Sequence, residues 1–142
     1  MRLVSQILQA KSSDVWTIPS SASVLDALTL MADKNIGALV VVDNEDVVGI
    51  FSERDYARKV ILKGKNSKDT SVNEIMTPDV ICIRPDQSVK KCMALMTDKR
   101  IRHLPVLSDD KLIGVISIGD VVKAIISEQR IMINQLEDYI YG

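Results

Sequence analysis

The distribution of apolar and polar positions along the chain predicts a strand, a helix, two strands and a second helix. Val24, Ala27 and Met31 recur at helical spacing, which is the pattern of a helix with one buried face. Ser23 stands where a helix N-cap is expected, and we expect Gly37 to end this helix. Short runs rich in apolar residues flank it and are typical of buried strands. The expected elements are a strand at Asp14–Ile18, a helix at Ser23–Lys34, strands at Ala38–Val42 and Val47–Phe51, and a helix from Ser52.

The same order of elements occurs a second time. Residues 15–61 align with residues 80–126 at a constant offset of 65 without a gap, and most aligned pairs are identical or both apolar. A repeat of this length cannot easily bury enough surface alone, so we expect the two copies to pack on one another. The second copy predicts a strand at Val80–Ile83, a helix at Ser88–Lys99, strands at His103–Leu107 and Leu112–Ile116, and a helix from Ser117.

A short amphipathic lead-in precedes each copy, and a polar linker separates the two. The lead-ins are Val4–Leu8 (VSQIL) and Val72–Met76 (VNEIM), and residues 64–70 (GKNSKDT) contain no large apolar side chain. We therefore expect four segments: 1–63, repeat 1 with its lead-in; 64–71, the linker; 72–126, repeat 2 with its lead-in; and 127–142, a C-terminal helix extension.

The last helix is expected to be unusually long, because nothing in the sequence ends it between Ser117 and Tyr141. An apolar stripe runs along it on alternating four- and three-residue steps, which is a heptad pattern. Such a stripe needs a partner. We expect a homodimer formed through the repeat faces and this helix; the alternative is that the helix folds back along its own subunit. The stripe consists of Val122, Ile126, Gln129, Ile133, Leu136 and Ile140.

Composition narrows the functional classes. Apolar residues make up 46% of the chain but aromatic residues only 4%, so the core must be aliphatic. Eighteen basic and nineteen acidic residues give a net charge of -1, which provides no basic patch for nucleic acid or an anionic membrane. No apolar run reaches the length of a membrane span, so we expect a cytoplasmic protein. Cys82 and Cys92 are expected to be small buried residues, and with one histidine no metal site is expected.

An apolar strand that contains glycine leads directly into Ser-x-x-Asp twice, in VVGIFSERD at 47–55 and in LIGVISIGD at 112–120. One interpretation is a helix cap, in which the serine and the acidic residue satisfy the first backbone N–H groups. The other is a nucleoside phosphate site, because a helix N-terminus attracts phosphate and a carboxylate can bind ribose hydroxyls. Gly49 and Gly114 indicate a close approach by another group. The spacing alone leaves both interpretations open.

The duplicated unit, with Ser-x-x-Asp closing each copy and RHLPV at 102–106, resembles a pair of CBS domains, also called a Bateman module. The resemblance extends from Val4 to about Ile126, and the chain also resembles stand-alone bacterial CBS-pair proteins. It implies a mixed α/β (α+β) fold of two β-α-β-β-α repeats packed with pseudo-two-fold symmetry, followed by the long C-terminal helix. It also implies an adenine nucleotide of the AMP type, or ADP, ATP, NAD(H) or S-adenosylmethionine, bound in the clefts between the repeats.

The resemblance carries binding residues over to two pockets. In one, Asp120 would hold the ribose diol, and Ser117 and Thr17 would offer hydroxyl groups. In the other pocket, Cys82 stands where Thr17 offers its hydroxyl in the first. We therefore expect the Asp120 pocket to bind nucleosides better. The first pocket comprises Asp120, Ser117, Thr17, Ala22, Ile36 and Gly37, and the second comprises Asp55, Ser52, Arg54, Cys82, Ile101, Arg102 and His103.

Phosphate beside an aspartate requires cations to offset the repulsion. Arg102, His103 and Arg54 are the candidates in the second pocket, and the alternative is that they are ordinary surface or strand-edge residues.

The resemblance implies a regulatory, energy-sensing nucleotide-binding module that changes conformation or assembly when ligand binds, and that acts on a protein partner. The alternative is a ligand-free scaffold that dimerises through the long helix. An enzyme is not expected, because the spacing of the single histidine, His103, suggests no nucleophile–base arrangement.

Overall fold

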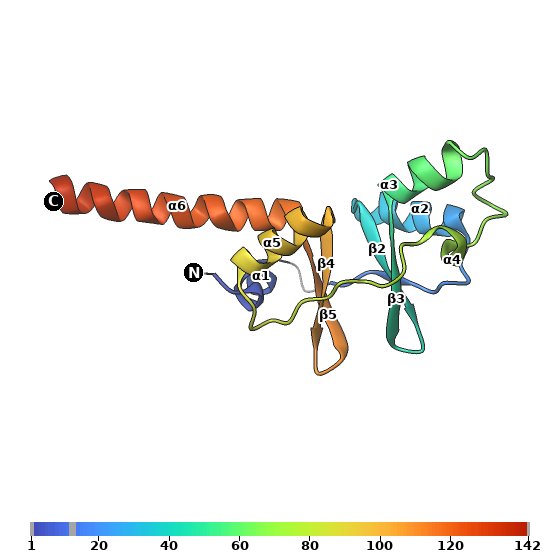
Figure 1. Cartoon of the computed structure of the whole chain (residues 1–142), viewed down its shortest axis with the longest axis horizontal. Helices are drawn as coiled ribbons and strands as arrows, with labels where there is room; N and C mark the ends of the chain where they lie inside the picture. The colour runs from blue at the N-terminus through green and yellow to red at the C-terminus, as the bar shows by residue number, and fades with distance from the viewer. Residues whose placement is uncertain (1, 12–13, 142) are drawn as a thin grey trace. The chain divides into compact units, whose positions relative to one another are not determined.

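The computed structural model describes residues 2–11 and 14–141; Met1, Ser12, Ser13 and Gly142 lie outside the described residues. The chain forms two compact units. One is continuous and consists of Val15–Ile81; the other consists of Met1–Asp14 together with Cys82–Gly142. We call them the inserted unit and the split unit, because the first interrupts the sequence of the second (Figure 1).

The inserted unit is a three-stranded sheet with helices packed against it. The strand order is β1-β2-β3; β1 runs parallel to β2, and β2 runs antiparallel to β3. Asn44 and Glu45, both at positive φ, form the tight turn between β2 and β3. Its elements are β1 (Thr17–Ile18), α2 (Val24–Lys34), β2 (Ala38–Asp43), β3 (Asp46–Ser52), α3 (Glu53–Tyr56), a π-helical turn η1 (Ala57–Ile61) and α4 (Val72–Ile75).

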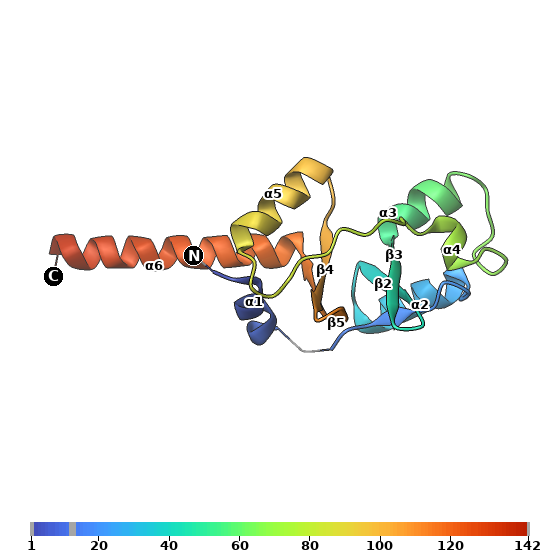
Figure 2. The same ribbon diagram turned by 60° about the horizontal axis from the view of Figure 1, so that its bottom comes forward.

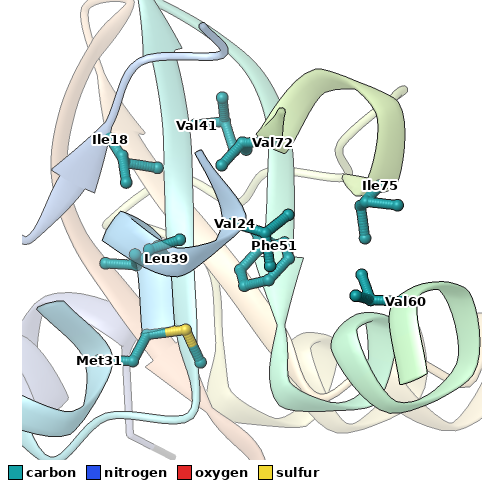
Figure 3. Packing of buried hydrophobic residues seen from close by; sticks show 10 residues of the cluster. Ile18, Val24, Met31, Leu39, Val41, Phe51, Val60, Val72 and Ile75 are labelled. Atoms are coloured by element: carbon teal, nitrogen blue, oxygen red, sulfur yellow. The ribbon is translucent and has the colours of Figure 1, made fainter. Parts of the chain in front are cut away.

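The core of the inserted unit is aliphatic around one aromatic ring. Phe51 is fully buried and lies beside Val24, as Figure 3 shows, while Ile75 faces Val60. Ile75 belongs to α4, so this segment, which precedes repeat 2 in the sequence, completes the core of repeat 1.

The split unit repeats the arrangement with one strand fewer. Strands β4 and β5 form an antiparallel hairpin. Helix α6 packs on β5, and α5 packs on α6. Its elements are α1 (Val4–Ala10), α5 (Val89–Lys99), β4 (His103–Ser108), β5 (Lys111–Ser117) and α6 (Ile118–Tyr141).

The mixed α/β fold predicted from the sequence is confirmed, with differences in detail. The strand expected at Asp14–Ile18 is shorter and consists of Thr17–Ile18. The helix from Ser23 begins as expected, because Ser23 Oγ accepts a hydrogen bond from Asp26 N at 3.0 Å. Its last residue is Lys34, as expected, but the residue that ends it is Asn35 in the left-handed conformation (φ 53°) and not Gly37. Asparagine tolerates this conformation, so no glycine is needed there.

The expected strand at Val80–Ile83 does not form as a strand. Only Ile83 pairs, in a parallel bridge with Val106. Ile83 N donates to Pro105 O at 2.9 Å, and Leu107 N donates to Ile83 O at 2.9 Å. Extending this parallel pairing by two residues towards Ile81 would require Pro105 to donate a backbone N–H, which proline lacks.

Each lead-in packs against the repeat that it does not precede. In the split unit, Leu3 forms a bridge with Ser88, and α1 contacts β5. In the inserted unit, Thr77 forms a bridge with Ile50 on β3. The segments preceding the two repeats are therefore exchanged between them.

Helix α6 runs without interruption from Ile118 to Tyr141, as predicted, and extends past the other elements of its unit (Figures 1 and 2). Val121 and Ala124 are buried, but every residue from 129 onwards that the structure describes is exposed. The alternative in which the helix folds back along its own subunit is therefore wrong for the described residues. None of the helices in the described ranges combines the length and the apolarity that crossing a membrane requires.

Candidate functional site: two aspartates at capped helix starts

Ser52 and Asp55 form a reciprocal cap at the start of α3. Ser52 N donates to Asp55 Oδ2 at 3.0 Å, and Asp55 N donates to Ser52 Oγ at 3.1 Å. Each side chain thus satisfies a backbone N–H that the helix itself leaves without a partner. The capping interpretation of this motif is confirmed, and it does not exclude a ligand, since a carboxylate can accept several hydrogen bonds.

Asp55 has two further partners in the inserted unit, and its side chain is only 12% exposed. Lys59 Nζ lies 3.2 Å from Asp55 Oδ1, one turn further along the chain, and also donates to Ile75 O at 3.0 Å. Thr77 Oγ1 donates to the same Oδ1 at 3.3 Å. Both oxygens of Asp55 therefore accept hydrogen bonds within the unit.

Ser117 and Asp120 form the equivalent cap at the start of α6. Ser117 N donates to Asp120 Oδ2 at 2.8 Å, and Asp120 N donates to Ser117 Oγ at 3.2 Å. Lys11 Nζ, the second donor to this carboxylate, also bonds to Oδ2. Within the described part of the chain, Asp120 Oδ1 therefore receives no hydrogen bond. Asp120 differs from Asp55 in keeping one oxygen available for a further donor.

Lys11, at the end of the N-terminal lead-in, provides the counter-charge for Asp120. Its Nζ donates to Asp120 Oδ2 at 2.6 Å and to Val115 O at 2.9 Å. Burial by itself would raise the pKa of Asp120, but the hydrogen bond from Lys11, its positive charge and the bonds from Ser117 outweigh burial and hold that pKa below its ordinary value. Asp120 is therefore an anion with a fixed cation beside it.

Gly49 and Gly114 do allow a close approach, and the approaching groups are the exchanged lead-ins. A Cβ atom built on Gly49 would lie 2.9 Å from Met76 Cγ and 3.1 Å from Thr77 O. One built on Gly114 would lie 2.5 Å from Leu8 Cδ2. The packing of the lead-ins explains both glycines, so they no longer favour the nucleotide interpretation over the capping one.

Each helix start lies next to the loop that precedes the second strand of its own repeat. Glu53 N donates to Gly37 O at 3.1 Å in the inserted unit. In the split unit, Ile118 N donates to Arg102 O at 2.9 Å, and His103 pairs directly with Ser117 across β4 and β5. The structure thus places Arg102 and His103 beside the helix that carries Asp120.

The remaining candidates are distributed between the two units. Thr17 and Arg54 are exposed, and Ala22 accepts a hydrogen bond from Val72 N at 2.8 Å through its carbonyl. Burial raises the pKa of Cys82 and raises that of Cys92 to about 11, as expected for cysteines that act as small packing residues. Thr17, Ala22, Ile36, Gly37, Ser52, Arg54 and Asp55 belong to the inserted unit, and Cys82, Ile101, Arg102, His103, Ser117 and Asp120 to the split unit.

A surface depression of about 620 Å³ lies beside the start of α3 in the inserted unit. It contains the expected residues Ile36 and Gly37, together with Glu53 and Tyr56. Its size is within the range of small-molecule sites. In the residue ranges that the structure describes, no group of three or more potential ligand side chains could hold a metal ion.

Sequence reasoning missed Lys11, Lys59 and Thr77. Lys59 carries a detectable signal, because it stands four residues after Asp55 on a helix, where opposite charges meet. Lys11 carries none, since only the exchange of the lead-ins brings it to Asp120, 109 positions away.

Comparison with known proteins identifies the family. The profile of the CBS domain matches residues 4–62 and 72–127. The mitochondrial CBS domain-containing protein CBSX3 of Arabidopsis thaliana is 46% identical, over 98% of this chain and 72% of that protein. Among solved structures, a putative signal-transduction protein with CBS domains from Burkholderia ambifaria is 54% identical with a TM-score of 0.86, covering 90% of this chain and 96% of that one. The CBS domain pair of protein MJ0100, in complex with 5'-methylthioadenosine and S-adenosyl-L-methionine, is 27% identical with a TM-score of 0.80, covering 90% and 98%.

Proposed function

Because this chain belongs to the CBS domain family and carries the domain twice, we propose that it is a regulatory module whose ligand contains adenosine. The proposal includes the AMP-type nucleotide expected from the sequence, and ADP, ATP, NAD(H) and S-adenosylmethionine share the same adenosine group. The complex of the MJ0100 domain pair with two adenosine compounds supports this ligand class.

The observation that carries the proposal is that Asp120 is ionised, fixed in place and has one oxygen available. Its carboxylate is ionised and is held in place by Ser117 N and Lys11, yet Oδ1 remains available among the described residues. A ribose diol offers two O–H donors, and a fixed carboxylate with an available oxygen is a suitable acceptor for them. Asp55 is the weaker candidate, because Thr77 and Lys59 already occupy its Oδ1.

Basic residues near Asp120 in the split unit support a phosphorylated ligand there. Lys11 neutralises the carboxylate, and Arg102 and His103 adjoin the same helix start through the backbone contacts of Ile118 and Ser117. The resemblance assigned Arg102 and His103 to the Asp55 pocket, whereas these contacts favour the Asp120 pocket. Both assignments stay predictions that mutations can separate.

Ligand titrations by calorimetry and thermal shift test the proposal. Adenosine, AMP, ATP, NADH and S-adenosylmethionine are compared on the wild type, Asp120→Asn and Asp55→Asn. A ligand at 100 times its Kd should add about 2.7 kcal/mol to the free energy of unfolding. We expect Asp120→Asn to abolish most of this gain and Asp55→Asn to leave most of it. A gain that is equal in all three proteins would refute ribose binding by Asp120.

Arg102→Ala and His103→Ala test whether these residues contact the phosphate of the ligand. We expect each to weaken AMP or ATP more than adenosine in the Asp55→Asn background, where only the Asp120 pocket is intact. If the extra loss appears only in the Asp120→Asn background, these residues serve the Asp55 pocket. Equal losses for adenosine and AMP in both backgrounds would refute a phosphate role.

A second candidate function is a ligand-free dimerisation scaffold, and the exposed apolar face of α6 favours it. Met132, Leu136 and Ile140 are 62%, 55% and 67% exposed, which is unusual for large apolar side chains in water. If no adenosine compound alters thermal stability and none is converted to product, the scaffold is the function. In the regulatory module, the same helix would form the homodimer. The geometry of that dimer would respond to the ligand, and a protein partner would recognise the change.

A further inference from the structure

The exposed half of α6 carries its apolar and charged side chains in a repeating arrangement. With Ile126, Ile133 and Ile140 at heptad position a, Gln129 and Leu136 fall at position d. Ile133 is 53% exposed and Leu136 is 55% exposed, so neither has a partner surface in its own subunit. A second helix of the same kind would bury this face.

Two charges flank the apolar face on one side. Position e is occupied by Arg130 and then, one heptad later, by Glu137, and both are exposed. Position g on the other side is apolar, with Met132 and Tyr139. Residues at e and g determine partner choice and orientation in paired helices.

From this pattern we propose that α6 pairs antiparallel with α6 of a second copy of the chain, in the register that sets Ile133 opposite Leu136 of the second copy. The geometry of antiparallel helices then sets Arg130 of each copy opposite Glu137 of the other, which gives two ion pairs of opposite charge. Met132 of each copy lies against Tyr139 of the other on the apolar side. Gln129 lies opposite Ile140 in the outermost layer, where its amide can reach water.

A parallel pair fits the same residues less well. Position e of one helix would then face position g of the other, so Arg130 and Glu137 would lie against apolar side chains instead of each other. Two Gln129 amides would also meet inside the apolar seam. The charges therefore favour the antiparallel arrangement.

The register is limited by the body of the split unit. In the proposed register, the overlap runs from Glu128 to Tyr141, about 21 Å of helix. Glu128 accepts a hydrogen bond from Arg2 N at 2.6 Å, which marks where α6 leaves its unit. A shift of one heptad would set Arg130 opposite Arg130, and the second copy would run along the part of α6 that packs on α5 and β5.

The inference deepens the homodimer of the proposed function but does not depend on ligand binding. The helix pairs through residues 128–141, whereas the candidate ligand residues end at Asp120. Failure of the dimer would leave adenosine binding intact, and failure of ligand binding would leave the dimer intact.

Charge reversal tests the orientation on the full chain. Arg130→Glu alone and Glu137→Arg alone should each weaken dimerisation about tenfold, since both ion pairs become repulsive, as measured by light scattering or analytical ultracentrifugation. The mixture of the two single variants should form heterodimers of nearly wild-type affinity, because each helix then faces the opposite charges. A mixture as weak as the single variants would overturn the antiparallel pairing, as would a monomeric wild type at high concentration.

Disulfide formation gives a second and independent measurement. In a Cys82→Ser background, Cys92 stays unreactive because it is buried and its pKa is raised to about 11. One chain carries Gln129→Cys and the other carries Ile140→Cys. The proposal expects cross-linked dimers only when the two chains are mixed and oxidised. Cross-linking of each chain with itself would establish the parallel pair, and no cross-linking in any sample would overturn the register.

Discussion

Lys11 Nζ lies 2.6 Å from Asp120 Oδ2, so a residue of the N-terminal lead-in neutralises the carboxylate that caps the last helix. The contact depends on the exchange of lead-ins between the repeats. Lys59 makes the matching contact to Asp55 from inside the same helical segment. In both candidate sites a lysine thus neutralises the aspartate, but only at Asp120 does that lysine come from the N-terminal lead-in.

Lys11→Met should make the protein less stable at neutral pH and its stability less dependent on pH. In the wild type the pKa of Asp120 lies below its ordinary value, so its ionised form stabilises the fold above about pH 4. That contribution is lost as the pH falls through the lowered pKa. Without Lys11, we expect the pKa of Asp120 to rise towards its ordinary value, so that the variant is less stable at pH 7 but loses less stability than the wild type as the pH falls to 3. Carboxyl NMR titration and urea unfolding between pH 7 and pH 3 measure the two effects; an unchanged pKa of Asp120 would contradict the prediction.

Gly49→Ala should destabilise the protein by about 1–3 kcal/mol, because the new Cβ meets Met76 and the backbone oxygen of Thr77. Adding Met76→Ala should recover only part of the loss, since Thr77 O cannot move away. Gly37→Ala is the matched control: nothing lies within 4 Å of its Cβ position, so its effect on stability should be neutral or slightly favourable. Chemical denaturation of the three variants gives the comparison.

Gly114→Ala should cost less than Gly49→Ala, because the clashing atom is the end of the flexible Leu8 side chain. Leu8→Ala should relieve the clash, so that the double variant is more stable than the sum of the two single losses predicts. Strict additivity of the two changes would show that Leu8 does not pack on Gly114.

Ser117→Ala separates capping from ligand binding. The loss of the cap should reduce the free energy of unfolding by about 0.5–2 kcal/mol, and adenosine affinity should fall as well. Ser88→Ala is the control, because Ser88 Oγ accepts a hydrogen bond from Lys91 N at the start of α5 and lies outside the candidate site. It should show the stability loss alone. If both variants bind adenosine like the wild type, Ser117 is only a cap.

Truncation after Ile126 should remove the dimer and keep the ligand response. The deleted residues are exposed from 129 onwards, so little folded-state packing is lost. Light scattering should report a monomer, and the thermal shift with adenosine should persist. A truncated protein that remains dimeric would place the interface on the repeats.

Local signals in the sequence predicted strands β2 to β5, the helix starts and the length of α6 well. Ser23, Ser52 and Ser88 each begin a helix, because the hydroxyl group of each accepts a hydrogen bond from the backbone N–H three residues later. These are contacts between near neighbours in the chain, which is why periodicity and cap residues suffice to find them.

Contacts between distant residues account for the errors. Pro105 prevents the parallel ladder at Val80–Ile83, although that segment alone has a strand pattern. Gly49 and Gly114 indicated a close approach by another group, and the approaching groups are the side chains of Met76 and Leu8. The sequence shows that something approaches these glycines, but only the fold shows what it is.

The interruption of one unit by the other has a consequence for synthesis on the ribosome. Residues 15–81 can fold as soon as they emerge from the ribosome. The hydrogen bond from Arg2 N to Glu128 cannot form until Glu128 has been synthesised, 126 positions later. At roughly 5–20 residues per second, this delay is on the order of 6–25 seconds. During that interval the amphipathic α1 has no partner in its own unit, so nascent chains should expose an apolar N-terminal segment to chaperones until translation is nearly complete.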